Sequence, residues 1–381
     1  MRQINQRLAI FTLIIMIVQL LWLEGYQVST VKVAFMAMTP LLALWRGIVV
    51  TKALIFGLLF FVITLLFQLF HLDSFRASTF IYTLLFLFMF NLYYGLVWEK
   101  KCFTLEEFTK VLEGIIKLFF YFMLLQQFCF LAGISLPILN THFNCVGHWK
   151  FNSLAIEPSQ TARLLTVFMY AYLKCIEYKS GSAPSIKLLW NRHRKILGMF
   201  LYMMLTMGSG TAMAGLVIVA LYFVRAKYLL ILLPSLLGIY MLAPLVENEA
   251  LNRFIVTAEA ALSMDTEVMT NADRSAAARV NILIDTINHL DLTDAQTWIG
   301  HGVDYKGEYV IVGAIADYGF VSYLFKLLFF FSCCFTGLFS LEVLMFVLLF
   351  GMNVGNIAYG WSALMVFSTL KYFKTKYRKR V

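Results

Sequence analysis

Long runs of apolar residues recur along the whole chain and are separated by shorter polar segments. Most runs hold close to the roughly 20 residues that a helix needs to cross a hydrocarbon core of about 30 Å. The runs are continuous rather than alternating, which favours helices over the strands of a transmembrane barrel. A helix also satisfies its own backbone groups in lipid. The pattern therefore predicts an all-α polytopic membrane protein in which residues 1–381 form a single transmembrane bundle.

We expect about twelve transmembrane helices. The predicted spans are 8–24, 31–45, 53–70, 79–97, 113–133, 161–177, 196–209, 211–224, 228–244, 309–326, 327–345 and 352–370. Gly208-Ser209-Gly210-Thr211 separates the seventh span from the eighth and predicts a tight turn or a broken helix. No small-residue cleavage site follows the first span, so we expect it to be retained as an anchor.

Two long polar segments, 134–160 and 245–308, interrupt this apolar pattern. Within the second segment, Asp273 is a suitable cap for a helix that runs to about Leu290. Apolar residues recur along that stretch at helical spacing and form one stripe. We therefore expect a large loop that carries short amphipathic helices.

Charge predicts the orientation of the chain. The 31 Lys and Arg residues outnumber the 21 Asp and Glu residues, and the net charge is +10. Most of the basic residues lie on one side of the predicted spans, which the positive-inside rule assigns to the cytoplasm. Both termini then lie in the cytoplasm, where the basic tail 371–381 can touch anionic lipid, and both long polar segments face outward. Topology accounts for the positive charge, so it does not indicate nucleic-acid binding.

Arginines on the outward side run against this rule and are candidate ligands for an anion. Arg253, Arg274 and Arg279 lie in the second polar segment, and Arg163 lies one turn into a predicted span. A guanidinium can hold a diphosphate through two parallel hydrogen bonds. The alternatives are a surface helix with snorkelling arginines for Arg274 and Arg279, and a structural partner inside the bundle for Arg163.

Three residues are candidates for a general base. Glu157 begins Glu157-Pro158-Ser159, His301 lies between two glycines, and Glu308 immediately precedes a predicted span. A carboxylate or an imidazole can accept a hydroxyl proton when it lies within hydrogen-bond reach. Ordinary helix-start chemistry explains part of the Glu157 signal, and a solvated loop histidine is the alternative for His301. Asp317, inside a predicted span, should face the bundle interior.

The sequence gives no sign of a metal or cofactor site. Its six cysteines lack metal-like spacing, and we expect them to act as small apolar packing residues. No phosphate-cradling P-loop or HExxH pattern is present, so ATP-driven transport and zinc chemistry have no support.

Taken in order, these motifs resemble the O-antigen polymerase and ligase superfamily of bacterial inner membranes. The order is Glu157-Pro158-Ser159, the Gly208–Thr211 break, Arg279 in a large outward loop, Trp298-Ile299-Gly300-His301-Gly302, and then Asp317-Tyr318-Gly319 in a span. The resemblance covers residues 150–325, and it implies that 134–160 and 245–308 are periplasmic loops.

The resemblance implies a metal-independent glycosyltransferase that moves a glycan from undecaprenyl diphosphate to an acceptor hydroxyl. Arg279 matches the arginine that binds the diphosphate in the family. A second family arginine is missing, because Gly210 follows Ser209, and Arg163 or Arg253 is its expected substitute. Glu308-Tyr309 stands where ligases have a His-Asn pair. The departure favours a surface-polysaccharide polymerase (Wzy type) that uses a carboxylate base.

The expected partners follow from that activity. They are the lipid-linked donor and acceptor, membrane lipids, and further proteins such as a chain-length regulator and a flippase. The product remains open between O-antigen, capsule and exopolysaccharide. A repeat-unit flippase or other transporter, or an O-antigen ligase, are the alternative functions. A transporter would typically show two similar halves, and the sequence has no internal repeat.

Overall fold

The computed structural model describes residues 1–18, 30–134, 149–224, 255–257, 259–260, 266–272, 277, 291–302, 311–355 and 358–377. Throughout these described ranges the regular elements are helices, and no strand is present. The chain divides into two compact units. The first unit comprises 1–18, 26–105 and 278–380, and the second comprises 19–25, 106–277 and 381. The all-α prediction is therefore confirmed for the described part of the chain.

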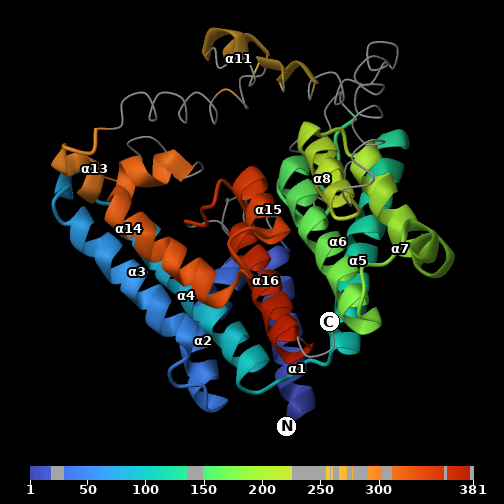
Figure 1. The fold of residues 1–381 in the computed structure, drawn as a ribbon, viewed down its shortest axis with the longest axis horizontal. Helices are drawn as coiled ribbons and strands as arrows, with labels where there is room; N and C mark the ends of the chain where they lie inside the picture. Colours follow the sequence, from blue (N-terminus) through green and yellow to red (C-terminus); the bar gives the residue numbers. More distant parts are fainter. Residues whose placement is uncertain are drawn as a thin grey trace. The chain divides into compact units, whose positions relative to one another are not determined.

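The first unit is organised around helix α4 (Ala77–Trp98), which packs against α2, α3 and α16 (Figure 1). Its helices, in chain order, are α1 (Arg2–Ile17), α2 (Thr30–Trp45), α3 (Lys52–Gln68), the 3₁₀ turn η2 (Leu72–Ser74), α4, α13 (Ala295–Ile299), α14 (Ile311–Cys333), α15 (Leu341–Phe350) and α16 (Ala358–Tyr377). The aromatic rings of Phe90, Phe329 and Trp361 pack together from α4, α14 and α16. The core of this unit thus joins helices from both ends of the chain.

Local sequence features explain where several of these helices begin and approach one another. The side chains of Thr51 and Ser340 accept hydrogen bonds from the first turns of α3 and α15 and so cap both helices. Gly57 and Gly95 give neighbouring side chains room against the backbone, because a Cβ would lie 2.1 Å from Leu87 Cδ1 at Gly57 and 2.5 Å from Ile48 Cγ2 at Gly95. Small residues at these positions let the helices pack closely.

Five helices of the second unit have described bounds. They are α5 (Leu105–Leu131), α6 (Pro158–Ser180), α7 (Ile186–Thr206), α8 (Gly210–Leu221) and α11 (Thr266–Ala272). Gly208 has φ +69° between α7 and α8, so the predicted break at 208–211 is confirmed as a turn between two helices. A Cβ there would lie 2.3 Å from the carbonyl oxygen of Trp149, which leaves room only for glycine.

Helix length and composition give the fold a membrane character. Among the described residues, three helices are long and apolar enough to cross a bilayer: Ala77–Trp98, Leu105–Leu131 and Ile315–Cys333. Shorter apolar helices are Val31–Trp45, Lys52–Gln68, Gly210–Leu221 and Leu341–Phe350. Many of their large apolar side chains are exposed, as expected of surfaces that meet lipid.

The structure corrects one predicted boundary and extends one helix. The predicted separation of spans 309–326 and 327–345 is wrong, because after Gly319 helix α14 continues through Lys326 to Cys333. Lys326 does not end the helix, since its ammonium group is buried and donates to Asn353 Oδ1 at 2.7 Å. Helix α16 extends to Tyr377 and so includes the first residues of the predicted tail 371–381.

Candidate functional site

Two of the motifs singled out in the sequence contact each other in the first unit. We call this contact, made by Trp298–Gly302 and Ala316–Gly319, the glycine junction. The backbone N–H of His301 donates to the carbonyl of Ala316 at 2.8 Å, and that of Gly302 donates to the carbonyl of Asp317 at 3.0 Å. His301 Nδ1 also lies 3.2 Å from the carbonyl oxygen of Ala316. The structure therefore brings His301 and Asp317 to one place.

A break in α14 makes this junction possible. Gly319 has φ +82° and ψ +157°, which interrupts the helix. The carbonyls of Ala316 and Asp317 lie just before the break, so the regular helical turn that would follow them is interrupted. They accept hydrogen bonds from the N–H groups of His301 and Gly302 instead. A helix broken at membrane depth is tolerated where protein supplies such replacement bonds. The backbone around His301 thus supplies the hydrogen bonds that the carbonyls before the break lack within their own helix.

The two glycines at the contact leave no room for side chains. A Cβ on Gly300 would lie 2.4 Å from the carbonyl oxygen of Asp317, and one on Gly319 would lie 2.3 Å from that of Trp298. Gly300 has φ +87°, which also disfavours any other residue. The ring of Trp298 packs edge-on against Phe320, with centroids 5.5 Å apart. These contacts fix the backbone that carries His301.

Helix α13 leads into the junction and begins with ordinary capping chemistry. The carboxylate of Asp294 accepts from Gln296 N at 3.0 Å and caps the helix. Hydrogen bonds from the Thr293 side chain and backbone hold the pKa of Asp291 below its usual value. The indole of Trp298 donates to the carbonyl of Leu292 at 2.9 Å. The approach to His301 is therefore ordered by local bonds.

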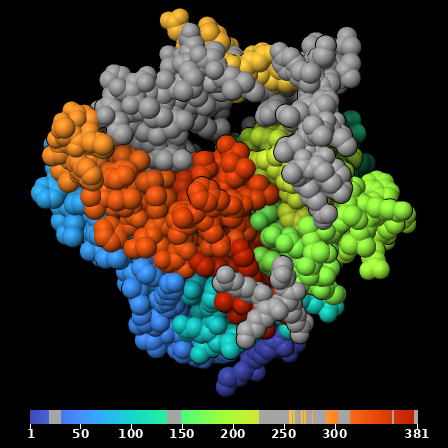
Figure 2. Space-filling model, viewed as in Figure 1, coloured from blue at the N-terminus to red at the C-terminus, as the bar shows by residue number. Residues whose placement is uncertain are grey.

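The segment after α3 also lies at the junction. A Cβ on Gly302 would lie 2.1 Å from Ser74 Oγ and 3.2 Å from His71 Cβ. Gln68 Nε2 donates to the carbonyl of His71 at 3.0 Å and to Ser74 Oγ at 3.1 Å. His71 Nε2 is buried and has no hydrogen-bond partner among the described residues. In Figure 2, orange atoms of α13 and α14 adjoin blue atoms of α3.

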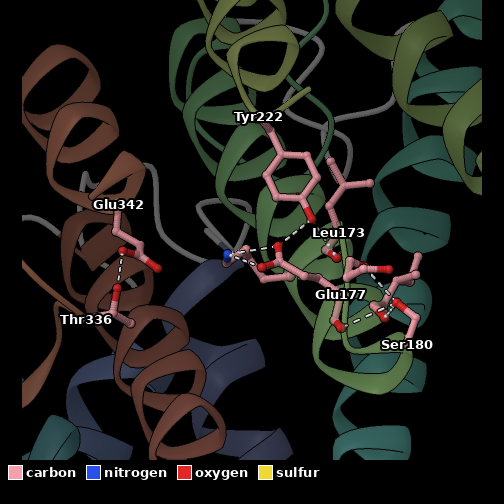
Figure 3. Close-up of polar contacts among 9 residues, drawn as sticks. Leu173, Glu177, Ser180, Tyr222, Thr336 and Glu342 are labelled. Carbon is pink, nitrogen blue, oxygen red and sulfur yellow. Dashed lines mark hydrogen bonds and ion pairs between the residues drawn. The ribbon is translucent and has the colours of Figure 1, made fainter. Parts of the chain in front are cut away.

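Helix α14 and its neighbours bury several charged groups. Asp317 is 1% exposed and Lys326 is 2% exposed. Lys326 Nζ lies 5.0 Å from the ring centre of Phe60 and 5.5 Å from that of Tyr318. Glu342 is also buried and accepts from Thr336 Oγ1 at 2.7 Å (Figure 3). Charged groups inside membrane helices commonly serve function.

Glu157 and Arg163 lie at the start of α6 in the second unit. Glu157 is the residue before Pro158 and is exposed, and its carboxylate accepts from Ser159 Oγ at 3.1 Å. Arg163 is half-buried in the first turns of the helix. A helix N-terminus and a guanidinium both favour an anion, so this end of α6 suits negative charge.

A buried polar network holds the chain that leads into α6. Gln126 Nε2 donates to Asn152 Oδ1 at 2.8 Å, and Gln126 Oε1 accepts from Ser153 N at 2.7 Å. Asn152 Nδ2 in turn donates to the carbonyl of Ile156 at 2.9 Å. A glutamine near the C-terminal end of the apolar helix α5 thus fixes the segment that ends at Glu157. The sequence analysis missed this network, for which the polar pair Gln126-Gln127 within a long apolar run was the available signal.

The structure describes only some of the predicted site residues. Glu157, Arg163 and His301 are described, whereas Arg253, Arg274, Arg279 and Glu308 lie outside the described residues. Sequence reasoning missed His71, Gln68, Ser74 and Lys326, which no recognised motif contains. A histidine and a serine immediately after a predicted span, on the same predicted outward side as His301, were the available signal.

The described side chains hold no metal-like cluster. Among these residues, no group of three or more His, Cys, Asp or Glu side chains gathers closely enough to hold a metal ion. The five cysteines that the structure describes are buried and carry free thiols. Their burial agrees with the expected packing role.

Comparisons with protein-family models, with curated proteins and with solved structures find no match to this chain.

Proposed function

We propose that the protein polymerises undecaprenyl-diphosphate-linked oligosaccharide repeat units into a bacterial surface polysaccharide. The reaction takes place at the periplasmic face of the inner membrane, in a bundle of about twelve transmembrane helices with both termini in the cytoplasm. The product is an O-antigen, a capsule or an exopolysaccharide. The protein acts as a metal-independent glycosyltransferase with lipid-linked donor and acceptor.

The glycine junction is the observation that supports this proposal most directly. The motif order that carries the resemblance includes Trp298–Gly302 and Asp317–Gly319, and these two motifs hydrogen-bond to each other through their backbones. The junction holds the backbone of His301 in a fixed place beside that of the buried Asp317.

The proposed reaction needs an anion clamp and a base. The bond between the donor sugar and the diphosphate breaks, and the acceptor hydroxyl forms the new bond to that sugar carbon as its proton moves to the base. The diphosphate needs charge stabilisation more than protonation, which Arg279 provides together with Arg163, Arg253 or Arg274. Glu308, His301 and Glu157 are the proposed bases. Two lipid-tethered chains held in one groove would supply much of the remaining rate.

The test is the length distribution of the surface polysaccharide in cells that lack the protein. Complementation uses the wild type, Arg279→Ala, Arg163→Ala and the surface control Lys110→Ala, whose exposed side chain pairs only with Glu106 in the described part of the chain. We expect single-repeat glycans in the deletion, a full ladder with wild type and Lys110→Ala, and a loss of long chains with both arginine variants at equal protein abundance. A persistent ladder in the deletion would overturn the proposal.

The buried charges of α14 favour a second candidate, a flippase for the same lipid-linked unit. Asp317 and Lys326 are nearly inaccessible inside a membrane helix, as in many transport pathways. The two functions separate by the side on which single units accumulate in the deletion. Accumulation on the periplasmic side supports polymerisation, whereas accumulation on the cytoplasmic side supports the flippase.

A further inference from the structure

The first half of α7 is a basic surface with an apolar edge. We call residues 186–195 the basic segment. Its Lys187, Arg192, Arg194 and Lys195 side chains are all exposed, and none takes part in an ion pair within the described residues. In Figure 2, yellow-green atoms from this region of the chain are visible at the surface. The four cationic side chains of the segment are therefore accessible to an external partner.

The apolar edge lies beside these cations. Ile186 is 65% exposed and Trp190 is 58% exposed, while Leu189 and Ile196 are buried and attach the segment to its unit. Ile186 and Trp190 are four residues apart, so they share one side of the helix. A tryptophan flanked by lysines and arginines is typical of a helix that lies in the interface between headgroups and acyl chains.

A kink lies inside this segment, at His193, so that Arg194 and Lys195 follow it. His193 has non-helical backbone angles, φ −125° and ψ +17°. Its Nδ1 lies 2.7 Å from the hydroxyl oxygen of Tyr172, and that hydroxyl also donates to Glu113 Oε1 at 3.0 Å. These contacts from α5 and α6 hold the kink. Residues 186–192 can therefore lie at an angle to the part of α7 that begins with Arg194 and Lys195.

Two carboxylates matter most here: Glu177 is the nearest in sequence, and Glu113 contacts the same Tyr172 hydroxyl as His193. Glu177 accepts from Lys174 Nζ at 2.9 Å and from the Tyr222 hydroxyl at 2.6 Å (Figure 3). Glu113 accepts from Tyr172 and pairs with Lys117 at 3.7 Å. The sequence holds no Asp or Glu between Glu177 and Glu247. Within the part of the chain that the structure describes, the basic segment thus pairs with no carboxylate, and its charge is available to an external anion.

We propose that the basic segment docks on the anionic phospholipids of the adjoining leaflet. Its cations contact phosphate groups, and Ile186 and Trp190 enter the boundary between headgroups and acyl chains. Charge complementarity identifies this partner, since a row of cations beside an exposed tryptophan matches a negatively charged lipid surface. The docking also positions the α6–α7 connection. The proposal stands independently of the polymerase activity.

The test measures the membrane depth of the segment in the full-length protein. A spin label is placed on Asn191→Cys, an exposed position that leaves both apolar anchors in place. The labelled protein is reconstituted in nanodiscs of phosphatidylcholine with or without phosphatidylglycerol. Accessibility to oxygen is compared with accessibility to a water-soluble nickel complex, and protein without this cysteine gives the background. We expect a lipid-buried label with phosphatidylglycerol and a water-exposed label without it.

Matched variants separate docking from a general charge effect. Arg192→Gln with Arg194→Gln should lower the buried-to-exposed ratio of the label by roughly 25-fold at low salt, since each cation near such a surface contributes roughly fivefold. Arg192→Lys with Arg194→Lys should keep the label buried. The control Arg7→Gln with Lys110→Gln removes two exposed cations elsewhere and should change nothing. Equal label depth in both lipid mixtures, or equal effects of both Gln pairs, would overturn the proposal.

Discussion

The glycine junction and the polar contacts around α6 meet the same need in different ways. At the junction, backbone N–H groups of His301 and Gly302 satisfy the carbonyls freed by the break at Gly319. Around α6, side chains such as Gln126, Tyr172 and Glu177 satisfy buried polar groups instead. The junction requires glycines, which have no side chain, whereas the contacts around α6 require specific polar side chains.

This difference predicts how each region responds to substitution. A close contact between two backbone segments cannot accommodate an added Cβ by a change of side-chain rotamer, because the atoms on both sides are backbone atoms. A side-chain network loses one bond at a time and can readjust around the gap. We therefore expect steep effects at the junction and graded effects around α6.

The largest effect is expected for Gly319→Ala and Gly300→Ala. In Gly319→Ala the added Cβ would lie 2.3 Å from the carbonyl oxygen of Trp298, and in Gly300→Ala it would lie 2.4 Å from that of Asp317. Both distances are shorter than van der Waals contact, and both positions have a positive φ that alanine rarely adopts. We expect destabilisation of roughly 3 kcal/mol or more, with loss of monodisperse protein in detergent. Thermal unfolding followed by size-exclusion chromatography measures this. Gly337→Ala, where nothing lies within 4 Å of the added Cβ, is the control and should behave as wild type.

An intermediate effect is expected for Gln126→Leu. The change leaves the buried Asn152 Oδ1 and the Ser153 N–H without their hydrogen bonds to Gln126. Each buried polar group left without a partner lowers the free energy of unfolding by about 1–3 kcal/mol. Thermal unfolding of the purified protein is the measurement. Tyr121→Phe on the exposed side of the same helix should leave the melting temperature unchanged. Equal melting temperatures for Gln126→Leu and Tyr121→Phe would show that the network contributes nothing.

A smaller effect is expected for Tyr222→Phe. The hydroxyl donates to Glu177 Oε2 at 2.6 Å, but Lys174 continues to bind that carboxylate after the change. We expect a loss of about 1 kcal/mol in the free energy of unfolding. Glu106→Gln provides the comparison. The side chains of Glu106 and Lys110 are 64% and 72% exposed, so their ion pair should contribute almost nothing to the free energy of unfolding. Losses of similar size in both variants would contradict this ranking.

The smallest effect concerns pH and His193. Burial holds the pKa of this histidine below its ordinary value of 6.5; nearby Arg192 and Lys179 also lower it, and Glu113 opposes them. The unfolded state therefore binds the proton more readily, and stability falls as the pH drops through about 6.5. We expect a weaker fall between pH 7.5 and pH 5.5 in His193→Gln than in the wild type, measured by thermal unfolding. Parallel curves would assign the pH dependence to other groups.

The sequence predicted several elements well because their signals are local. The apolar run 79–97 corresponds to α4 at 77–98, and the glycines near 208 predicted the turn that separates α7 from α8. The boundary at 326 was wrong because the cost of a lysine in an apolar helix depends on its partner. Asn353 lies 27 positions away, so a local pattern cannot include the bond that makes Lys326 acceptable.

The candidate site shows the same limit. The sequence drew attention to Gly300-His301-Gly302 and to Asp317-Tyr318-Gly319 separately, through their residue types. It did not predict that their backbones bond to each other, or that His71 and Ser74 lie against Gly302. Such contacts depend on how α3, α13 and α14 pack, which hydropathy alone does not specify.

The sequence by itself determined the helical, membrane-type character of this protein and the turn between α7 and α8 at Gly208. Apolar run length and glycine content act locally, and the bilayer admits few other solutions. Only the tertiary structure decided which polar groups satisfy one another, such as Lys326 with Asn353 and Gln126 with Asn152. Those pairs join residues from different helices, and the cost of burying each one depends on whether its partner arrives in the folded state.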